Sequence, residues 1–462
     1  GIYARLASES NLTSTGNFAQ SKFLQYLHDR RKALHGYTPV RLPKFSETLT
    51  LPELSAFDSL LEEQKREIST TMAFVRALNV LLKDPNIGQQ IVPIIADEAR
   101  TFGMEGLFRQ IGIYNPRGQT YTPEDRAVVS YYKEETSGQV LQEGINELGA
   151  MASWVAAATS YSTNDLPMIP FYIYYSMFGF QRVGDMAWLA GDQQARGFLL
   201  GATAGRTTLN GEGLQHEDGH SHILAGTVPN CISYDPTYSY ELAVIIQDGI
   251  RRMYGASQEN IYYYITVMNE NYHHPAMPAG AEEGIRRGIY KLESHAGDKA
   301  KVQLLGSGTI MNEVRKAAEI LSEDYGVGSD VFSVTSFNEL ARDGQDCERY
   351  NMLHPMAEEK VPYIAKVLGT APAIAATDYM KNYADQVRSF VPAVSYKVLG
   401  TDGFGRSDSR ENLRRHFEVN AGYIVLASLR ELAKRGEIDK QLVADAIARF
   451  GIDTNKTNPL YA

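Results

Sequence analysis

The spacing of hydrophobic and polar positions changes several times along the chain, and these changes mark out helices and strands. Residues 68–84 carry apolar side chains at helical intervals, and the proline and glycine of residues 85–88 end the predicted helix. Residues 89–97 form a short β-branched run, which predicts a strand. Residues 138–162 are rich in small side chains and predict a long helix. Residues 168–176, aromatic and β-branched, predict the next strand.

From there on, predicted strands and helices alternate with a period of about thirty residues, the length of a βαβ unit. This alternation is typical of a parallel sheet. A segment interrupted by proline and glycine, residues 269–284, separates it from a second alternating run. We therefore predict an α/β fold in three parts: a polar N-terminal arm or linker over residues 1–50, a parallel-sheet domain over residues 51–276, and a smaller α/β domain over residues 277–462.

Ligands of open parallel sheets lie beyond the carboxyl ends of the strands. Candidate side chains occur at three predicted strand ends. They are the acidic pair Asp97 and Glu98, the aromatic pair Tyr175 and Phe178, and the loop around His216. Most aromatic side chains in residues 171–180 are expected in the core, with one or two rings left to meet a planar ligand.

Composition narrows the class of protein. The formal net charge of −10 and the absence of basic blocks argue against a nucleic-acid partner. No apolar run is long enough for a membrane span, and no signal peptide opens the sequence. Two cysteines among 462 residues fit a reducing cytoplasm. Because the sequence begins with Gly1 rather than Met, we expect a fragment or a processed product.

Residues 209–222 hold several side chains that can bind metals or transfer protons. Three of the ten histidines lie here, and His216 to His220 match the HExxH pattern of zinc peptidases. That pattern needs both histidines on one helix. Gly213 and Gly219 disfavour a helix here, so the segment is predicted to be a loop. Three interpretations stay open: a zinc hydrolase, a purely structural polar loop, and a loop that places His216 over a ligand held elsewhere.

Glu147 is the second candidate. Gly144, Leu148, Gly149 and Ala150 flank it, which predicts a buried carboxyl without a cation partner. Such a group has its pKa raised and can donate a proton to a ring nitrogen. The alternative is an ordinary solvated glutamate on a helix face.

Five segments together closely resemble the homodimeric bacterial pyruvate dehydrogenase component family, whose members are thiamin-diphosphate-dependent decarboxylases. The segments are residues 97–114, 142–154, 166–182, 205–222 and 399–419. The resemblance extends over essentially the whole chain. It implies a pyrimidine-binding domain followed by a transketolase-like C-terminal domain, which is the second half of such an enzyme.

The resemblance also implies roles. Glu147 would hold a proton at the pyrimidine ring of the cofactor, Tyr175 and Phe178 would pack against that ring, and His216 would act at the substrate end. Asp97 and Glu98 match an acidic pair near the same cavity.

Three further features follow from the same resemblance. Glu212 and Arg182 resemble members of a charged network between the two active sites of a homodimer, although an ordinary ion pair is an equal alternative. His220 and His222 are expected to shape the loop. Residues 114–132 resemble a flexible active-site loop.

The implied reaction converts pyruvate and the lipoyl group of dihydrolipoyl acyltransferase into CO2 and S-acetyldihydrolipoyl-lysine. Enzymes of this type hold the diphosphate through Mg2+ and a GDG motif, and no GDG occurs in the sequence. We therefore expect no metal ligands in this chain, with those ligands in a missing N-terminal half, and little activity from the fragment alone. Alternatives are another thiamin enzyme such as a transketolase, a zinc hydrolase, and a non-catalytic scaffold.

Overall fold

The computed structural model describes residues 22–33, 41–96, 99–124, 132–210 and 213–462. The chain forms two compact units, Gly1–Glu47 with Ser160–Leu166, and Thr48–Thr159 with Pro167–Ala462. The described part of the smaller unit contains α3 (Lys22–Ala33) and α8 (Ser160–Asn164). In that unit the amide of Leu42 donates to the carbonyl of Ser162 at 2.8 Å.

The described part of the larger unit contains two large sheets and a two-stranded one formed by β2 (Ile113–Tyr114) and β3 (Glu134–Glu135). The first large sheet is wholly parallel among the described residues. Its strands lie in the order β4 (Leu141–Glu143), β1 (Ile91–Ala96), β5 (Ile169–Tyr175), β6 (Phe198–Ala202), β8 (Tyr262–Thr266) and β7 (Cys231–Tyr234). Every residue of β1 and β6 is buried. Burial of both faces is the reason these strands are continuous apolar runs rather than alternating ones.

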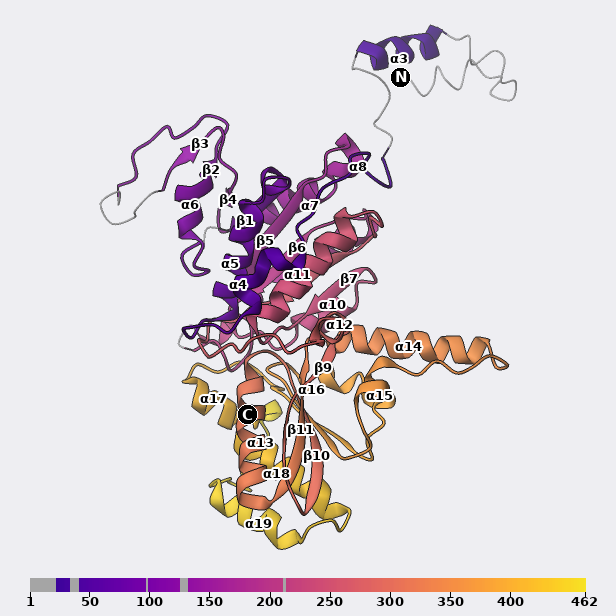
Figure 1. The fold of residues 1–462 in the computed structure, drawn as a ribbon. Helices are drawn as coiled ribbons and strands as arrows, with labels where there is room; N and C mark the ends of the chain where they lie inside the picture. The colour runs from indigo at the N-terminus through magenta and orange to yellow at the C-terminus, as the bar shows by residue number, and fades with distance from the viewer. Residues whose placement is uncertain (1–21, 34–40, 97–98, 125–131, 211–212) are drawn as a thin grey trace. The chain divides into compact units, whose positions relative to one another are not determined.

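Helices cover this sheet (Figure 1). They are α5 (Thr70–Leu82), α7 (Glu147–Ala158), α9 (Gly179–Asp192), α10 (Ser221–Gly226) and α11 (Ser239–Tyr254). Trp154 of α7 is fully buried and packs edge-on against Tyr262 of β8 with ring centroids 5.6 Å apart. Its indole donates to the carbonyl of Phe198 at 3.1 Å. One side chain thus ties a covering helix to two strands.

The second sheet has the order β13 (Tyr396–Leu399), β12 (Ala373–Ala376), β10 (Ala300–Gly306), β11 (Val327–Val334) and β9 (Ile289–His295). Its edge strand β9 runs antiparallel to β11. The helices that accompany it are α12 (Ala281–Arg287), α13 (Met311–Tyr325), α14 (Phe337–Leu353), α15 (Tyr363–Val367), α16 (Lys381–Asp385), α17 (Arg410–His416), α18 (Ala421–Lys434) and α19 (Lys440–Arg449).

The remaining described elements are short. They are η1 (Leu54–Phe57), α4 (Asp58–Leu61), η2 (Gly88–Gln90), α6 (Glu105–Ile111), β2 (Ile113–Tyr114), β3 (Glu134–Glu135), η3 (Leu214–His216), η4 (Gly308–Ile310), η5 (Arg388–Phe390) and η6 (Pro459–Tyr461). None of the described helices combines the length and apolar character that crossing a membrane requires.

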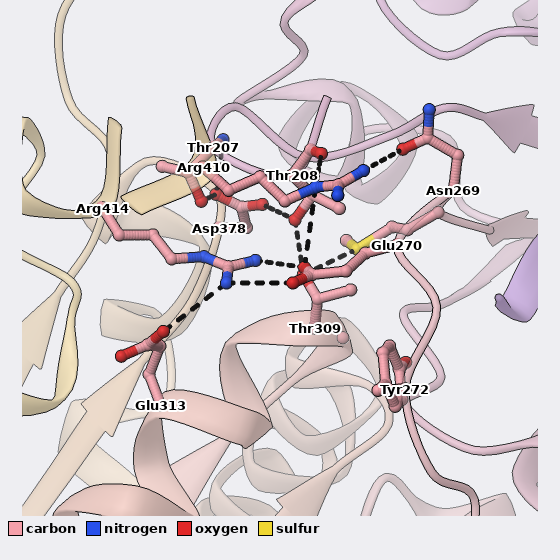
Figure 2. Close-up of polar contacts among 12 residues, drawn as sticks. Thr207, Thr208, Asn269, Glu270, Tyr272, Thr309, Glu313, Asp378, Arg410 and Arg414 are labelled. Carbon is pink, nitrogen blue, oxygen red and sulfur yellow. Dashed lines mark hydrogen bonds and ion pairs between the residues drawn. The ribbon is translucent and has the colours of Figure 1, made fainter. Parts of the chain in front are cut away.

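The two sheets meet through a buried polar junction (Figure 2). Asp378, which follows β12, is fully buried and accepts hydrogen bonds from Thr207 and Thr208, which follow β6. Beside it, Arg414 of α17 pairs with Glu270, which follows β8. All these residues except Arg414 lie beyond the carboxyl ends of strands, so the carboxyl edges of the two sheets face each other.

Most predicted elements are present, but the long helix over residues 138–162 is wrong. Residues 141–143 form β4, and α7 begins only at Glu147. The side chain of Asn146 accepts a hydrogen bond from the amide of Gly149 at 3.1 Å, which caps the helix at this point. Three helices rather than the predicted two close the chain.

The two tryptophans provide a matched test of this packing. Trp154→Ala should lower the free energy of unfolding by about 3–5 kcal/mol, because it empties a filled core site. Trp188→Ala on α9 should change it by less than about 0.5 kcal/mol, because that side chain is half exposed. Urea unfolding followed by far-UV circular dichroism measures both. Equal effects would show that α7 does not pack as described.

Candidate active site

A cavity of about 260 Å³ opens beyond the carboxyl ends of β1 and β5. Ten described residues line it: Ala96, Phe102, Ile145, Glu147, Tyr174, Tyr175, Phe178, Arg182, Gln215 and His216. Aromatic rings make up much of the wall, with one carboxyl, one guanidinium and one imidazole among them. Small-molecule sites commonly have this mixture of apolar walls and a few polar groups, and the volume suits a single heterocyclic ring.

Three of the predicted residues form an aromatic cluster. Tyr175 is the last residue of β5, Phe178 precedes α9, and His216 ends η3. The imidazole of His216 lies 4.8 Å from the Tyr175 ring and 5.0 Å from the Phe178 ring, measured between centroids. The end of a strand and the start of a helix therefore hold the two rings. His216, which is 41 positions after Tyr175 and 38 after Phe178, is brought to them by the loop after β6.

Glu147 lies on the same cavity, but its environment differs from the one predicted. Its flanking residues Ile145 and Leu148 are exposed, whereas its own side chain is 14% exposed and thus largely buried. Arg182 of α9 donates to Glu147 Oε1 at 2.7 Å. The predicted absence of a cation partner is therefore wrong, because the fold brings Arg182 in the first turn of α9 to the first residue of α7. A helix N-terminus also favours a negatively charged side chain.

The Arg182 guanidinium makes a second contact: its central carbon lies 3.9 Å from the centroid of the Phe178 ring. A flat cation is therefore stacked on an aromatic face and hydrogen-bonded to the cavity's carboxylate at the same time. Among the described residues Arg182 thus pairs with Glu147, which does not test its predicted relation to Glu212. Glu212, like Asp97 and Glu98, lies outside the described residues.

The segment that matches HExxH is not a zinc-peptidase helix. His216 ends η3, whereas His220 precedes α10, and Gly213 has a φ of 91°. Asp218 caps α10 by accepting hydrogen bonds from the amides of His220 and Ser221 at 2.9 and 3.0 Å. From Gly213 to His220 the prediction of a loop is confirmed apart from the single turn of η3, whereas Ser221 and His222 belong to α10. Within the ranges that the structure describes, no group of three or more His, Cys, Asp or Glu side chains is arranged to hold a metal ion.

Several lining residues were not among the predicted site residues. Phe102 packs edge-on against Tyr175 with centroids 5.3 Å apart, and Gln215 lies next to His216. Phe102 occurs in a stretch without strand or helix periodicity, so only the folded chain brings it to the cavity. Nothing in the sequence pointed to Gln215 except its position next to His216.

The sequence matches two family descriptions, "Pyruvate dehydrogenase E1 component middle domain" over residues 52–275 and "Transketolase-like TK C-terminal domain" over residues 288–420. It is 73% identical over 437 residues to the pyruvate dehydrogenase E1 component of Escherichia coli (strain K12), covering 95% of this chain and 49% of that protein. The chain belongs to the pyruvate dehydrogenase E1 component family.

Two other E1 components are similar. That of Haemophilus influenzae is 67% identical, covering 95% of this chain and 50% of the relative, and that of Pseudomonas aeruginosa is 60% identical, covering 94% and 50%. The chain spans about half the length of the curated E1 components that it matches.

Solved structures of transketolases have a similar fold. Transketolase from Leishmania mexicana matches with a TM-score of 0.60 at 18% identity, covering 82% of this chain and 48% of that one. Transketolase from Campylobacter jejuni matches with a TM-score of 0.59 at 16% sequence identity, covering 81% of this chain and 49% of that one. The predicted fold class is confirmed: this E1 family member has a transketolase-like α/β fold with a parallel sheet followed by a smaller second sheet.

The pH dependence of stability tests the packing of the histidine segment. Burial lowers the pKa of His222 from its ordinary 6.5 to about 3, and nearby Asp218 opposes this shift. The ring stacks on Tyr383 with centroids 4.8 Å apart. As the pH falls below 6.5, the unfolded chain binds a proton at this histidine and the folded chain does not, so stability is lost. Between pH 7 and 4.5 that loss should be about 2.5 kcal/mol.

The variant His222→Phe should remove this part of the pH dependence, measured by urea unfolding at a series of pH values. Tyr383→Phe serves as the control, because it alters the same stack without removing the imidazole. Parallel curves for His222→Phe and the unmodified chain would contradict the buried neutral state of this ring.

Proposed function

We propose that this chain belongs to a thiamin-diphosphate-dependent pyruvate dehydrogenase, the acetyl-transferring oxidoreductase that converts pyruvate and a lipoyl group into CO2 and S-acetyldihydrolipoyl-lysine. The observation that carries the proposal is a carboxyl group, Glu147, on the rim of a ring-sized cavity with aromatic walls, in a chain of the E1 component family. In this proposal residues 51–276 form the pyrimidine-binding domain, residues 277–462 form the C-terminal domain, and residues 1–50 are a linker.

The residues present fit the pyrimidine part of the cofactor. Tyr175 and Phe178 offer two ring faces for a flat heterocycle, and Glu147 offers a carboxyl at the cavity edge. When bound, the cofactor would supply a carbon nucleophile and a sink for the electrons released with CO2. Neither a GDG sequence nor a described metal-ligand group is available for a Mg2+–diphosphate pair. We propose that polypeptide outside these residues holds that part.

Glu147 would keep a proton at the pyrimidine ring nitrogen. It could do so through Oε2, since Arg182 donates to Oε1, or by exchanging the Arg182 contact for the ring nitrogen. This exchange is sterically open, because half of the Arg182 side chain is exposed to solvent. Once freed, the guanidinium can turn outward, and the Phe178 face that it covers becomes available for stacking.

His216 would act on pyruvate and the acetyl group. Its ring lies against Tyr175 and Phe178, so a substrate attached beyond a bound heterocycle would lie within its reach. An imidazole there can orient a carboxylate and move a proton during acetyl transfer. We assign Asp97 and Glu98 a supporting electrostatic role, and we assign Glu212 with Arg182 to a charged network between the sites of a cytoplasmic homodimer.

The lipoyl group of dihydrolipoyl acyltransferase would be the acetyl acceptor. A transketolase reaction is less well supported, because a sugar phosphate needs a basic clamp. Arg182 is the only arginine or lysine among the described lining residues, and it is already paired with Glu147.

Calorimetric titration with thiamin diphosphate and Mg2+ tests the proposal directly. We expect binding when the chain is combined with the polypeptide that supplies the remaining length of its relatives, and little binding by the chain alone. Zinc analysis of the same samples checks the hydrolase alternative. No binding in the mixture, together with one zinc per chain, would refute the thiamin site.

In the assembled enzyme, Glu147→Gln should lower the rate of pyruvate decarboxylation by about 100-fold or more, because the amide cannot hold the proton at the ring nitrogen. Thermal unfolding should stay near that of the unmodified enzyme. The matched control is Glu293→Gln, which alters another partly buried glutamate paired with an arginine, Arg315, at 2.9 Å. Normal decarboxylation by Glu147→Gln would show that the role of Glu147 is misassigned.

His216→Ala should slow acetyl transfer to the lipoyl group by about 100-fold while leaving the fold intact. Separate assays of decarboxylation and of reductive acetylation locate the affected step. His273→Ala, which removes an exposed histidine paired with Glu63, is the control. If His216→Ala instead unfolds the chain, the segment has a structural role and not a chemical one.

A further inference from the structure

The segment that carries His216 is held by loops of the second sheet. Arg206, four residues after β6, is buried and donates through Nη1 to the carbonyls of Thr401 and Gly403, each at 2.5 Å. Its Nε lies 3.5 Å from the carbonyl of Glu217. One guanidinium therefore joins the residue next to His216 to the loop that follows β13.

Glu217 makes the reciprocal contact. Its side chain is buried, and Oε2 accepts a hydrogen bond from the amide of Arg406 at 2.6 Å. Two residues on, the carbonyl of Gly219 accepts from the amide of Met380, which follows β12, at 2.7 Å. Attachments to two loops of the second sheet thus fix residues 217–219.

The fit between these segments leaves no space for extra atoms. A Cβ added at Gly219 would lie 2.4 Å from the Arg206 guanidinium carbon. A Cβ added at Gly405 would lie 2.8 Å from Glu217 Oε2 and 2.9 Å from the carbonyl oxygen of Leu214. Backbone and side chains of both sheets are therefore in direct contact around the histidine segment, and a shift of one must move the other.

No residue of the second sheet or its loops is among the described residues that line the cavity. The second sheet is connected to the cavity through residues 217–219, which follow His216 in the sequence. We propose that Arg206 and Glu217 are positioning residues: they clamp residues 217–219 to the loops after β12 and β13, and so fix the His216 imidazole against Tyr175 and Phe178. The effect of these residues on catalysis rests on the proposed role of His216. Their effect on the position of His216 does not, because it follows from the contacts within the fold.

The test measures the accessibility of His216 in the chain itself. Carbethoxylation of histidines by diethylpyrocarbonate, followed by peptide mass spectrometry, gives a modification rate for each histidine. Arg206→Lys keeps the positive charge but loses the forked donors, so the clamp should open locally. We expect the rate at His216 to rise by about threefold or more as the ring leaves its aromatic neighbours.

Arg342→Lys is the matched control. Arg342 of α14 also donates to two carbonyls across the two sheets, those of Cys231 and Val228, at 2.8 and 2.9 Å. It does not touch the histidine segment, so the His216 rate should stay as in the unmodified chain. A rise of equal size in Arg342→Lys would indicate general loosening and would overturn the proposal.

Two further variants keep the test decisive if Arg206→Lys does not fold. Glu217→Gln retains an oxygen that can accept from Arg406 and should leave the His216 rate unchanged, whereas Glu217→Ala should raise it. Gly405→Ala presses on the same segment from the other side and should also raise it. An unchanged rate in both Glu217→Ala and Gly405→Ala would refute the clamp.

Turnover of the assembled enzyme separates this inference from the proposed function. If His216 acts on substrate, Arg206→Lys should lower kcat with little change in KM for pyruvate, since the ring is misplaced after binding. A raised modification rate with normal turnover would leave the clamp in place and refute the catalytic role of His216. A normal modification rate with reduced turnover would refute the clamp.

Discussion

The buried carboxylate of Asp378 is the contact on which the arrangement of the two sheets depends. It accepts the backbone amide of Thr207 at 2.8 Å and the hydroxyls of Thr207 and Thr208 at 2.7 and 2.6 Å. Burial raises the pKa of this carboxyl, and these hydrogen bonds act in the opposite direction. A buried carboxyl that lost such partners would cost several kcal/mol. The donors and the acceptor must therefore stay together, and they belong to different sheets.

This constraint reaches the cavity because Thr207 and Thr208 lie between β6 and the histidine segment. Once Asp378 fixes them, the chain beyond them starts from a defined point. Asp218 then fixes its far end by capping α10. The cavity is thus formed by two kinds of support: rigid strand and helix ends for Tyr175 and Phe178, and a loop held at both ends for His216. Groups that must act together need this kind of rigid surrounding.

Strand and helix positions were predictable from the sequence where burial is uniform. The apolar runs of β1 and β5 predict strands that are buried on both faces, and the spacing of apolar residues in α9 predicts a helix with one buried face. The antiparallel direction of β9 was not predictable, since an edge strand has the same composition in either direction. The start of α7 depended on one capping side chain, Asn146, inside a run of residues that all suit a helix.

The candidate site shows the same division. Residues such as His216, Tyr175 and Phe178 could be selected by type and position, but the hydrogen-bonding and charged partners of the site could not. Arg182 reaches Glu147 across 35 positions of sequence, and Arg206 reaches Thr401 across 195. Such pairs are set by the order of strands in the sheet and by how the sheets meet. No local pattern carries that information, which is why the cation beside Glu147 was missed.

The Glu147–Arg182 pair limits what the cavity can accept. A ligand that enters meets a carboxyl that already accepts from Arg182 through Oε1 and a Phe178 ring on which the same cation is stacked. A purely apolar molecule that displaced the cation would leave the carboxyl unpaired, at a cost of the order of a few kcal/mol. A flat heterocycle with a basic ring nitrogen replaces both contacts, because its face stacks and its nitrogen meets the carboxyl. The pair therefore favours a ligand that supplies both interactions over one that supplies only one of them.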